Sequence, residues 1–130
     1  MPARRPQGDG FVLAVLRSPA HRLLRGMAIE LRYTGRRSGR QFTLPVQYAR
    51  EAERLLVAVQ DPSTKTWWRN FRTALEVSVR LQGELRRGTA LVVGPDDPMW
   101  DRDRRLYVAR WRRLAGRVSG PLVQITLHEL

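Results

Sequence analysis

The segment GRRSGR at residues 35–40 combines residue types that are suited to binding an anion. Its two glycines allow backbone conformations that bring N–H groups close to a ligand. Guanidinium forks and a hydroxyl group could clamp a phosphate or a carboxylate. The residues that carry them are Arg36, Arg37, Ser38 and Arg40. Their charges have no evident packing role, but polar turns are common, so a plain solvated basic turn remains open beside an anion site.

The segment KTWWRNFR at residues 65–72 places two adjacent tryptophans among basic residues. Neighbouring residues of a helix face directions about 100° apart, so both rings rarely point into one core. A three-residue step puts Trp67 and Asn70 on nearly the same helical face. We therefore expect one of the two rings to pack inward and the other to line a surface or a cleft. The alternatives are two core tryptophans, or an aromatic and basic strip that stacks on nucleic acid bases.

Side chains for direct acid–base or nucleophilic catalysis are scarce. The sequence has no cysteine and no GxSxG motif, and His21 and His128 lie at opposite ends without metal-ligand spacing. Neither thiol chemistry nor a metal site is expected. The aspartates near residue 100 are best explained by the start of a helix, where they complement its dipole; they are Asp96, Asp97, Asp101 and Asp103. An enzyme with this inventory would rely on a bound cofactor for the reaction.

The composition favours a basic, globular protein. The chain has 130 residues with a formal net charge of +12, and all but one of its 24 basic residues are arginine. Such a charge favours an anionic partner, and apolar runs such as LLVAV exclude disorder as the main state. The apolar run near the N-terminus is too short for a signal peptide or a membrane span. We expect one cytoplasmic domain over residues 1–130, with 1–8 as a polar lead-in, that could also touch a membrane surface.

Hydrophobic periodicity predicts an α+β fold with a mainly antiparallel sheet. The expected strands are 27–34, 41–48, 55–60, 77–81, 85–93 and 122–128, and the expected helices are 11–17, 19–25, 66–73 and 96–116. Residues 50–53 are expected to form a turn. Pro45 lacks an N–H donor and should restrict its strand to an edge of the sheet or leave a gap in the ladder. Six strands around one core suggest a small barrel.

Several motifs, in this order, resemble the deazaflavin (F420)-dependent nitroreductase family of actinobacteria. They are TGRRSGR at 34–40, LPV at 44–46, the strand at 55–58 and WWRNFR at 67–72. This family belongs to the split β-barrel oxidoreductases that bind flavin or deazaflavin. The resemblance implies a six-stranded split barrel, similar to FMN-binding split barrels, with about three flanking helices. It also implies coenzyme F420, a deazaflavin with a phosphate and an oligoglutamate tail, with FMN as the alternative cofactor.

The resemblance implies roles for four groups of residues. The hairpin tip would hold the anionic tail, through Arg36, Arg37, Ser38 and Arg40. The second strand would run beside the ring system, at Pro45, Val46 and Gln47. The end of the third strand would meet the ring, at Ala58, Val59 and Gln60. The following loop and helix would close the pocket, with Lys65, Trp67, Trp68 and Asn70. On this placement Trp67 and Asn70 would face the pocket, and Trp68 would point toward the core or the entrance.

The function implied by the resemblance is hydride transfer from reduced F420 to a quinone, a nitroaromatic or a related conjugated acceptor. The catalytic proton donor is not identified, and Tyr107, the one late tyrosine, is the candidate. A lipid or fatty-acid carrier of the same fold, or a cofactor-binding protein without activity, is the first alternative. A nucleic-acid-binding domain, argued from charge and WWRNFR alone, is the second. Monomer and homodimer are both compatible with the sequence.

Overall fold

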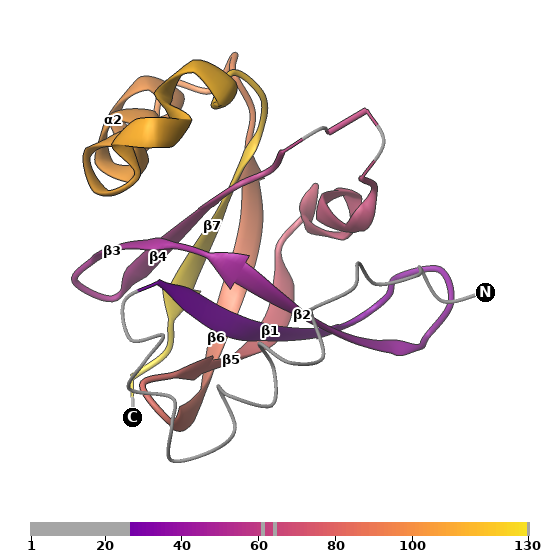
Figure 1. Ribbon diagram of the computed structural model, residues 1–130. Helices are drawn as coiled ribbons and strands as arrows, with labels where there is room; N and C mark the ends of the chain where they lie inside the picture. The colour runs from indigo at the N-terminus through magenta and orange to yellow at the C-terminus, as the bar shows by residue number, and fades with distance from the viewer. Residues whose placement is uncertain (1–26, 61, 64, 130) are drawn as a thin grey trace.

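The protein folds into a curled antiparallel sheet with helices at its margins (Figure 1). The computed structural model describes residues 27–60, 62–63 and 65–129. Within these ranges there are seven strands: β1 (Ala28–Thr34), β2 (Gln41–Gln47), β3 (Ala49–Glu51), β4 (Arg54–Ala58), β5 (Leu75–Leu81), β6 (Glu84–Val93) and β7 (Leu122–Leu127). They also hold one α-helix, α2 (Trp100–Arg110), and two 3₁₀-helices, η2 (Trp67–Phe71) and η3 (Arg112–Arg117). The predicted lead-in at 1–8 and helices at 11–17 and 19–25 lie outside the described residues.

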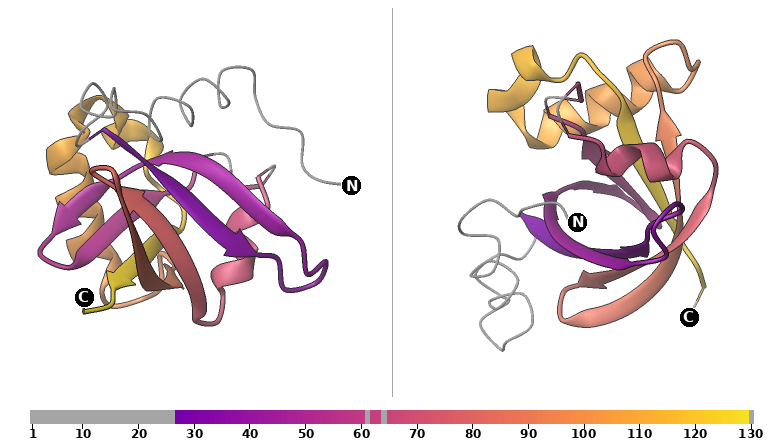
Figure 2. Two further views of the ribbon diagram at one scale, coloured as in Figure 1. Left: turned by 90° about the horizontal axis from the view of Figure 1, so that it is seen from below. Right: turned by 90° about the vertical axis from the view of Figure 1, so that its right-hand side faces the viewer.

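The strand order explains how the sheet curls. The order is β2-β1-β5-β6-β7-β4-β3, and each neighbouring pair is antiparallel. The two outer strands, β2 and β3, are consecutive in the chain and are separated only by Tyr48. One continuous segment therefore pairs with β1 through its first half and with β4 through its second half. Figure 2 shows the resulting curved sheet around a single interior.

The predicted count of six strands is wrong, because residues 49–51 form a separate strand. Alternating hydrophobicity continues through Tyr48, so the pattern does not reveal where the chain leaves one partner strand for another. The predicted turn is correspondingly shorter than 50–53, since Arg50 belongs to β3 and Ala52 adopts a positive φ of 53° in the turn. Pro45 does lie in an outer strand, as predicted: it pairs with Glu30 on one side only.

The inner face of the sheet holds the larger core. Ile29, Leu31 and Tyr33 alternate into it from β1, as the sequence predicts, and Val79 and Ile125 join them from β5 and β7. A second cluster lies between the sheet and α2, and it includes Leu56, Tyr107 and Leu122. This second cluster exists because α2 packs against β3, β4 and β7 on the other side of the sheet.

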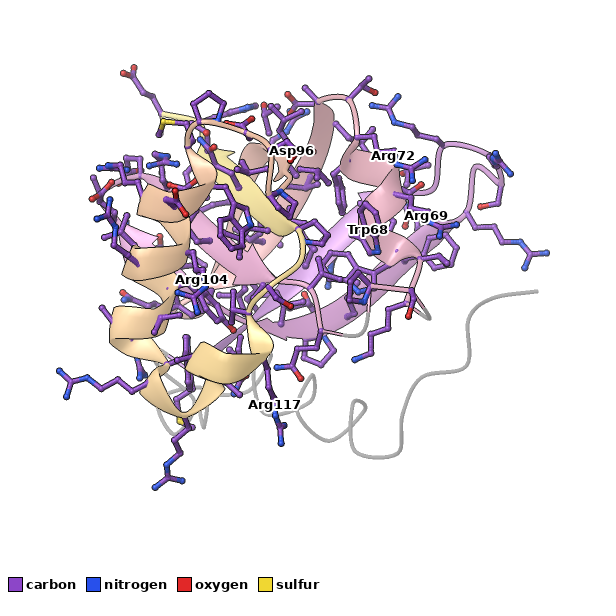
Figure 3. All side chains as sticks on the ribbon, turned by 90° about the horizontal axis from the view of Figure 1, so that it is seen from above. Trp68, Arg69, Arg72, Asp96, Arg104 and Arg117 are labelled. Carbon is purple, nitrogen blue, oxygen red and sulfur yellow. The ribbon has the colours of Figure 1, made fainter. Side chains whose placement is uncertain are left out.

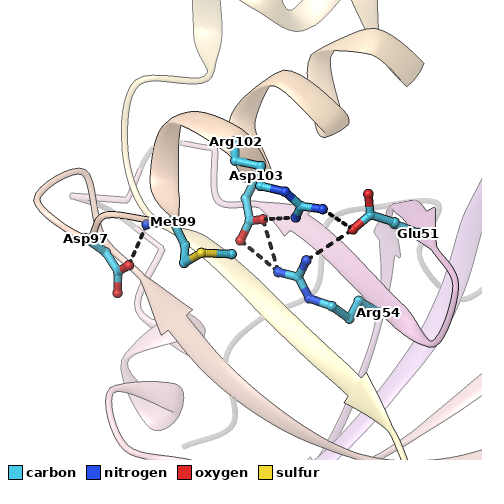
Figure 4. Close-up of polar contacts among 6 residues, drawn as sticks. All are labelled: Glu51, Arg54, Asp97, Met99, Arg102 and Asp103. Carbon is cyan, nitrogen blue, oxygen red and sulfur yellow. Dashed lines mark hydrogen bonds and ion pairs between the residues drawn. The ribbon is translucent and has the colours of Figure 1, made fainter.

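An ion-pair network fixes α2 to the β3–β4 hairpin (Figure 4). Asp103 is fully buried and accepts two hydrogen bonds from Arg54, at 3.0 and 3.1 Å. Glu51 accepts from Arg102 at 2.8 Å and from Arg54 at 3.3 Å. Both bonds to Asp103 come from Arg54 Nη2. This contact sets the position of the helix, because a buried charge needs its partner in place.

The predicted helix 96–116 is divided in the structure. Its first residues form a turn in which Asp97 Oδ1 accepts from the Met99 N–H at 2.8 Å, and α2 begins at Trp100. The helix ends at Arg110 because Trp111 leaves helical geometry, with φ −121° and ψ 65°. The indole Nε1 of Trp111 donates to Tyr48 O at 2.8 Å, so a tertiary contact coincides with the break. None of the helices in the described ranges is long and apolar enough to cross a membrane.

Candidate functional site

A cavity of about 460 Å³ lies between the β1–β2 hairpin tip and η2. It joins the two motifs that stand out in the sequence, GRRSGR and WWRNFR. Its lining is Gly35, Arg36, Arg37, Ser38, Phe42, Thr66, Arg69, Asn70 and Arg72. These lining residues include four arginines and no acidic residue, so the cavity is strongly cationic. We call it the cationic cavity below; Figure 3 labels Trp68, Arg69 and Arg72 beside it.

The hairpin tip has the compact backbone that its glycines allow. The Gly35 N–H donates to Arg40 O at 2.8 Å, and the Gly39 N–H donates to Gly35 O at 3.0 Å. Gly39 has φ +67°, which other residues adopt at a cost. A Cβ on Gly35 would lie 2.8 Å from the Phe42 ring, so only glycine lets this aromatic ring pack directly under the tip.

Arg36 connects the hairpin tip to η2. Its backbone N–H donates to Asn70 Oδ1 at 3.0 Å, and its Nε donates to Asn70 O at 2.8 Å. Its Nη2 donates to Thr73 O at 3.0 Å and to Ala74 O at 2.8 Å. The expectation that these tip charges have no packing role is therefore wrong for Arg36. The turn alone could not reveal this role, because the partner Asn70 lies 34 residues away in sequence.

The predicted helix 66–73 is the shorter 3₁₀-helix η2. In a 3₁₀-helix, residues three apart lie directly above one another. Trp67 and Asn70 are thus aligned, and Asn70 Nδ2 donates to Trp67 O at 2.9 Å. Asn70 lines the cationic cavity, whereas Trp67 packs against the core with its ring 6.1 Å from that of Phe71. Both residues were expected to face the pocket. Asn70 does line the cationic cavity, but Trp67 does not.

Trp68 organises the arginines on this side of the cavity. Its Nε1 donates to Lys65 O at 2.7 Å, and its ring is half-buried against the core. The guanidinium groups of Arg69 and Arg72 lie over the ring, 5.7 and 5.4 Å from its centroid. Each stack is a cation–π contact that leaves the N–H donors free to bind other groups. Both tryptophans are partly buried, which does not favour the stacking of nucleic acid bases on a pair of exposed rings.

Phe42 is the aromatic floor of the cavity, and Tyr33 and Phe71, outside the lining, continue the aromatic packing. Phe42 stacks on Tyr33 with 5.4 Å between centroids, and Tyr33 meets Phe71 edge to face at 5.1 Å. Burial raises the pKa of Tyr33 to about 12, because the phenolate is poorly solvated there. The cavity therefore combines a cationic rim with an apolar floor.

The structure brings together only part of the site expected from the sequence. Arg36, Arg37, Ser38 and Asn70 line the cationic cavity; Arg40, Lys65 and Trp67 do not. The expected ring-side residues also lie outside its lining: Pro45, Val46, Gln47, Ala58, Val59 and Gln60. They come from β2 and from the end of β4, two segments that approach one another across the curl. Val46 and Val59 are buried, so only their backbone could meet a ligand without rearrangement.

Arg69 and Arg72 were not expected among the site residues, although both stand in the WWRNFR motif. Their three-residue spacing is the signal that could have identified them, since a 3₁₀-helix places such residues on one side. Thr66 and Phe42 also line the cavity. No sequence pattern identifies these two, because they reach the cavity only through the packing of the hairpin on η2.

Tyr107 lies in the core, away from the cationic cavity. Its side chain is 1% exposed in the cluster under α2, and burial raises its pKa to about 12. The phenol of Tyr107 is therefore packed beneath α2 and does not line the cationic cavity. No three His, Asp or Glu side chains gather as a metal site within the described ranges.

The sequence matches the family model described as F420H(2)-dependent quinone reductase over residues 16–127. The chain belongs to this family. The match confirms the resemblance to deazaflavin-dependent reductases, and coenzyme F420 is accordingly the cofactor of this F420-dependent reductase. The cationic cavity fits that cofactor, because its four arginines without a lining carboxylate suit a phosphate and an oligoglutamate tail.

Solved structures support the fold. An F420-H2-dependent reductase (FDR-A) is 18% identical with a TM-score of 0.64, covering 75% of this chain and 92% of that one. A chain described as a domain-swapped dimer is 16% identical with a TM-score of 0.67, covering 89% of this chain and 94% of that one. A further F420 reductase is 16% identical with a TM-score of 0.50, covering 96% and 97%. At these identities the likeness concerns the fold alone; no curated protein matches the chain.

Proposed function

We propose that this F420-dependent reductase reduces a quinone, a nitroaromatic or a related conjugated acceptor, with the anionic end of the cofactor in the cationic cavity. When bound, reduced F420 supplies the hydride. The observation that carries the proposal is the cavity itself: four arginines and no acidic residue line it, at the junction of the two motifs. The protein contributes position and electrostatics, and the cavity would bind the anionic end of the cofactor through charge.

The residues of the cavity divide into two functions. Guanidinium groups of the lining and Ser38 would hold the phosphate and the glutamates, and the Phe42 floor would exclude water beneath them. From there the ring system would extend along Pro45, Val46 and Gln47 toward Ala58, Val59 and Gln60. This placement requires the backbone of β2 and the end of β4 to face the ring, since Val46 and Val59 point into the core.

The test is a titration with F420, with FMN as a parallel control. The cavity has more cations than one phosphate needs, so F420 should bind more tightly than FMN, and the preference should fall as salt is raised. Deazaflavin fluorescence reports binding directly. Equal or tighter binding of FMN at low salt would contradict the proposal. Turnover with quinone and nitroaromatic acceptors then identifies the acceptor class.

A further inference from the structure

Arg36 lines the cationic cavity, but most of its side-chain donors bind protein oxygens. Its Nε and Nη2 donate to Asn70 O, Thr73 O and Ala74 O at 2.8 to 3.0 Å. These carbonyls lie at the end of η2 and in the segment that leads into β5. Carbonyl groups at a helix end lack partners within the helix, and a cationic side chain satisfies them. The donors of Arg36 are therefore largely engaged before any ligand arrives.

The other three arginines of the cavity have available donors. The side chains of Arg37, Arg69 and Arg72 form no hydrogen bond or ion pair with other described residues, and none lies opposite a carboxylate. Arg69 and Arg72 are restrained only through the face of Trp68. Stacking fixes the plane of a guanidinium and leaves its N–H groups at the rim.

We propose that Arg36 is a positioning residue, and that Arg37, Arg69 and Arg72 contact the anionic end of the cofactor. The inference deepens the proposed function and rests on it. Arg37 belongs to the hairpin, whereas Arg69 lies in η2 and Arg72 caps its C-terminal end, so two separate parts of the chain must be held at a fixed spacing. Arg36 links these two parts. Preorganised charges bind an anion more tightly because no ordering has to accompany binding.

The first experiment compares single variants of the full chain without cofactor and with an anionic probe. Arg36→Ala should lower the Tm by roughly 5 °C, because it removes three hydrogen bonds between the hairpin tip and residues 70–74. Arg37→Ala and Arg72→Ala should leave the Tm nearly unchanged and weaken tripolyphosphate binding by about tenfold or more. Arg113→Ala changes an exposed arginine on η3 that has no hydrogen-bond partner among the described residues; it is the matched control and should change neither.

The second experiment separates the position of Arg36 from its charge. The chain has no cysteine, so Arg36→Cys with Thr73→Cys can be joined by a short bifunctional thiol reagent. The guanidinium of Arg36 reaches the Thr73 carbonyl, so the two positions lie about one arginine side chain apart. The unlinked double variant should bind tripolyphosphate weakly. The linked variant should recover most of the affinity although the charge is still missing.

Three results would overturn the assignment. They are an unchanged Tm for Arg36→Ala, unchanged tripolyphosphate affinity for Arg37→Ala and Arg72→Ala, or a linked variant with restored Tm and persistently weak binding. The last result would make Arg36 a direct ligand. Parallel F420 titrations keep the two proposals distinct. Wild-type protein that binds tripolyphosphate through Arg37 and Arg72 but not F420 would contradict the proposed function, while the positioning role of Arg36 in an anion site would stand.

Discussion

Tyr107 provides a test that separates a packing residue from a catalytic one. Burial raises its pKa to about 12, whereas a tyrosine in an unfolded chain ionises near pH 10. Below pH 10 the phenol is neutral in both states, so its contribution to stability is complete. Between pH 10 and 12 only the unfolded state loses the proton, and the free energy of unfolding therefore falls as pH rises.

The size of the expected loss of stability follows from the shift in the pKa of Tyr107. Two pKa units correspond to about 2.7 kcal/mol, which is a large share of the roughly 5–15 kcal/mol that stabilises a domain. Tyr33 has a similar shift and adds a similar loss. We expect urea denaturation to show a steep decline in stability between pH 10 and 12. Tyr107→Phe should reduce that decline by about 2–3 kcal/mol, with little change in stability at pH 7.

Turnover completes the test. Tyr107→Phe should reduce an acceptor at nearly the wild-type rate at pH 7, because the side chain lies under α2 and outside the cationic cavity. An alkaline stability profile identical to that of the wild type would refute the argument from burial. A folded variant that binds F420 but has lost turnover would return Tyr107 to a catalytic role.

Three further substitutions test the packing around the site. Asp103→Ala should destabilise the fold by about 3 kcal/mol, measured in urea, since Arg54 loses its buried partner; a change under 1 kcal/mol would show that α2 is held by other contacts. Gly35→Ala should lower stability by about 1–3 kcal/mol through a clash with the ring beneath it, while Gly116→Ala, which meets open space, should not. Trp68→Ala should cost about 2 kcal/mol, because the ring is half-buried, and should also weaken F420 binding; normal binding by fluorescence titration would argue against the stacked arginines.

Short-range pattern was enough to predict most of the strands. Ile29, Leu31 and Tyr33 alternate with polar residues, and the inner face of β1 is made of these three. Pro45 restricted its strand to an edge for a purely local reason, the missing N–H donor. The cationic hairpin tip and the tryptophan segment were likewise recognisable from composition and spacing. Local chemistry thus determined which segments form the candidate site.

Tertiary structure decided which residues of those segments contact one another. Arg36 and Arg37 are adjacent and chemically identical, yet only Arg36 meets the carbonyl groups beyond η2, because the fold places residues 70–74 on one side of the turn. Tyr107 could be a surface tyrosine by sequence, and the packing of α2 buries it. Residue type and spacing determine the chemistry that a side chain can perform. Contacts between residues far apart in sequence decide which side chains are already engaged, and these contacts exist only after the sheet has curled.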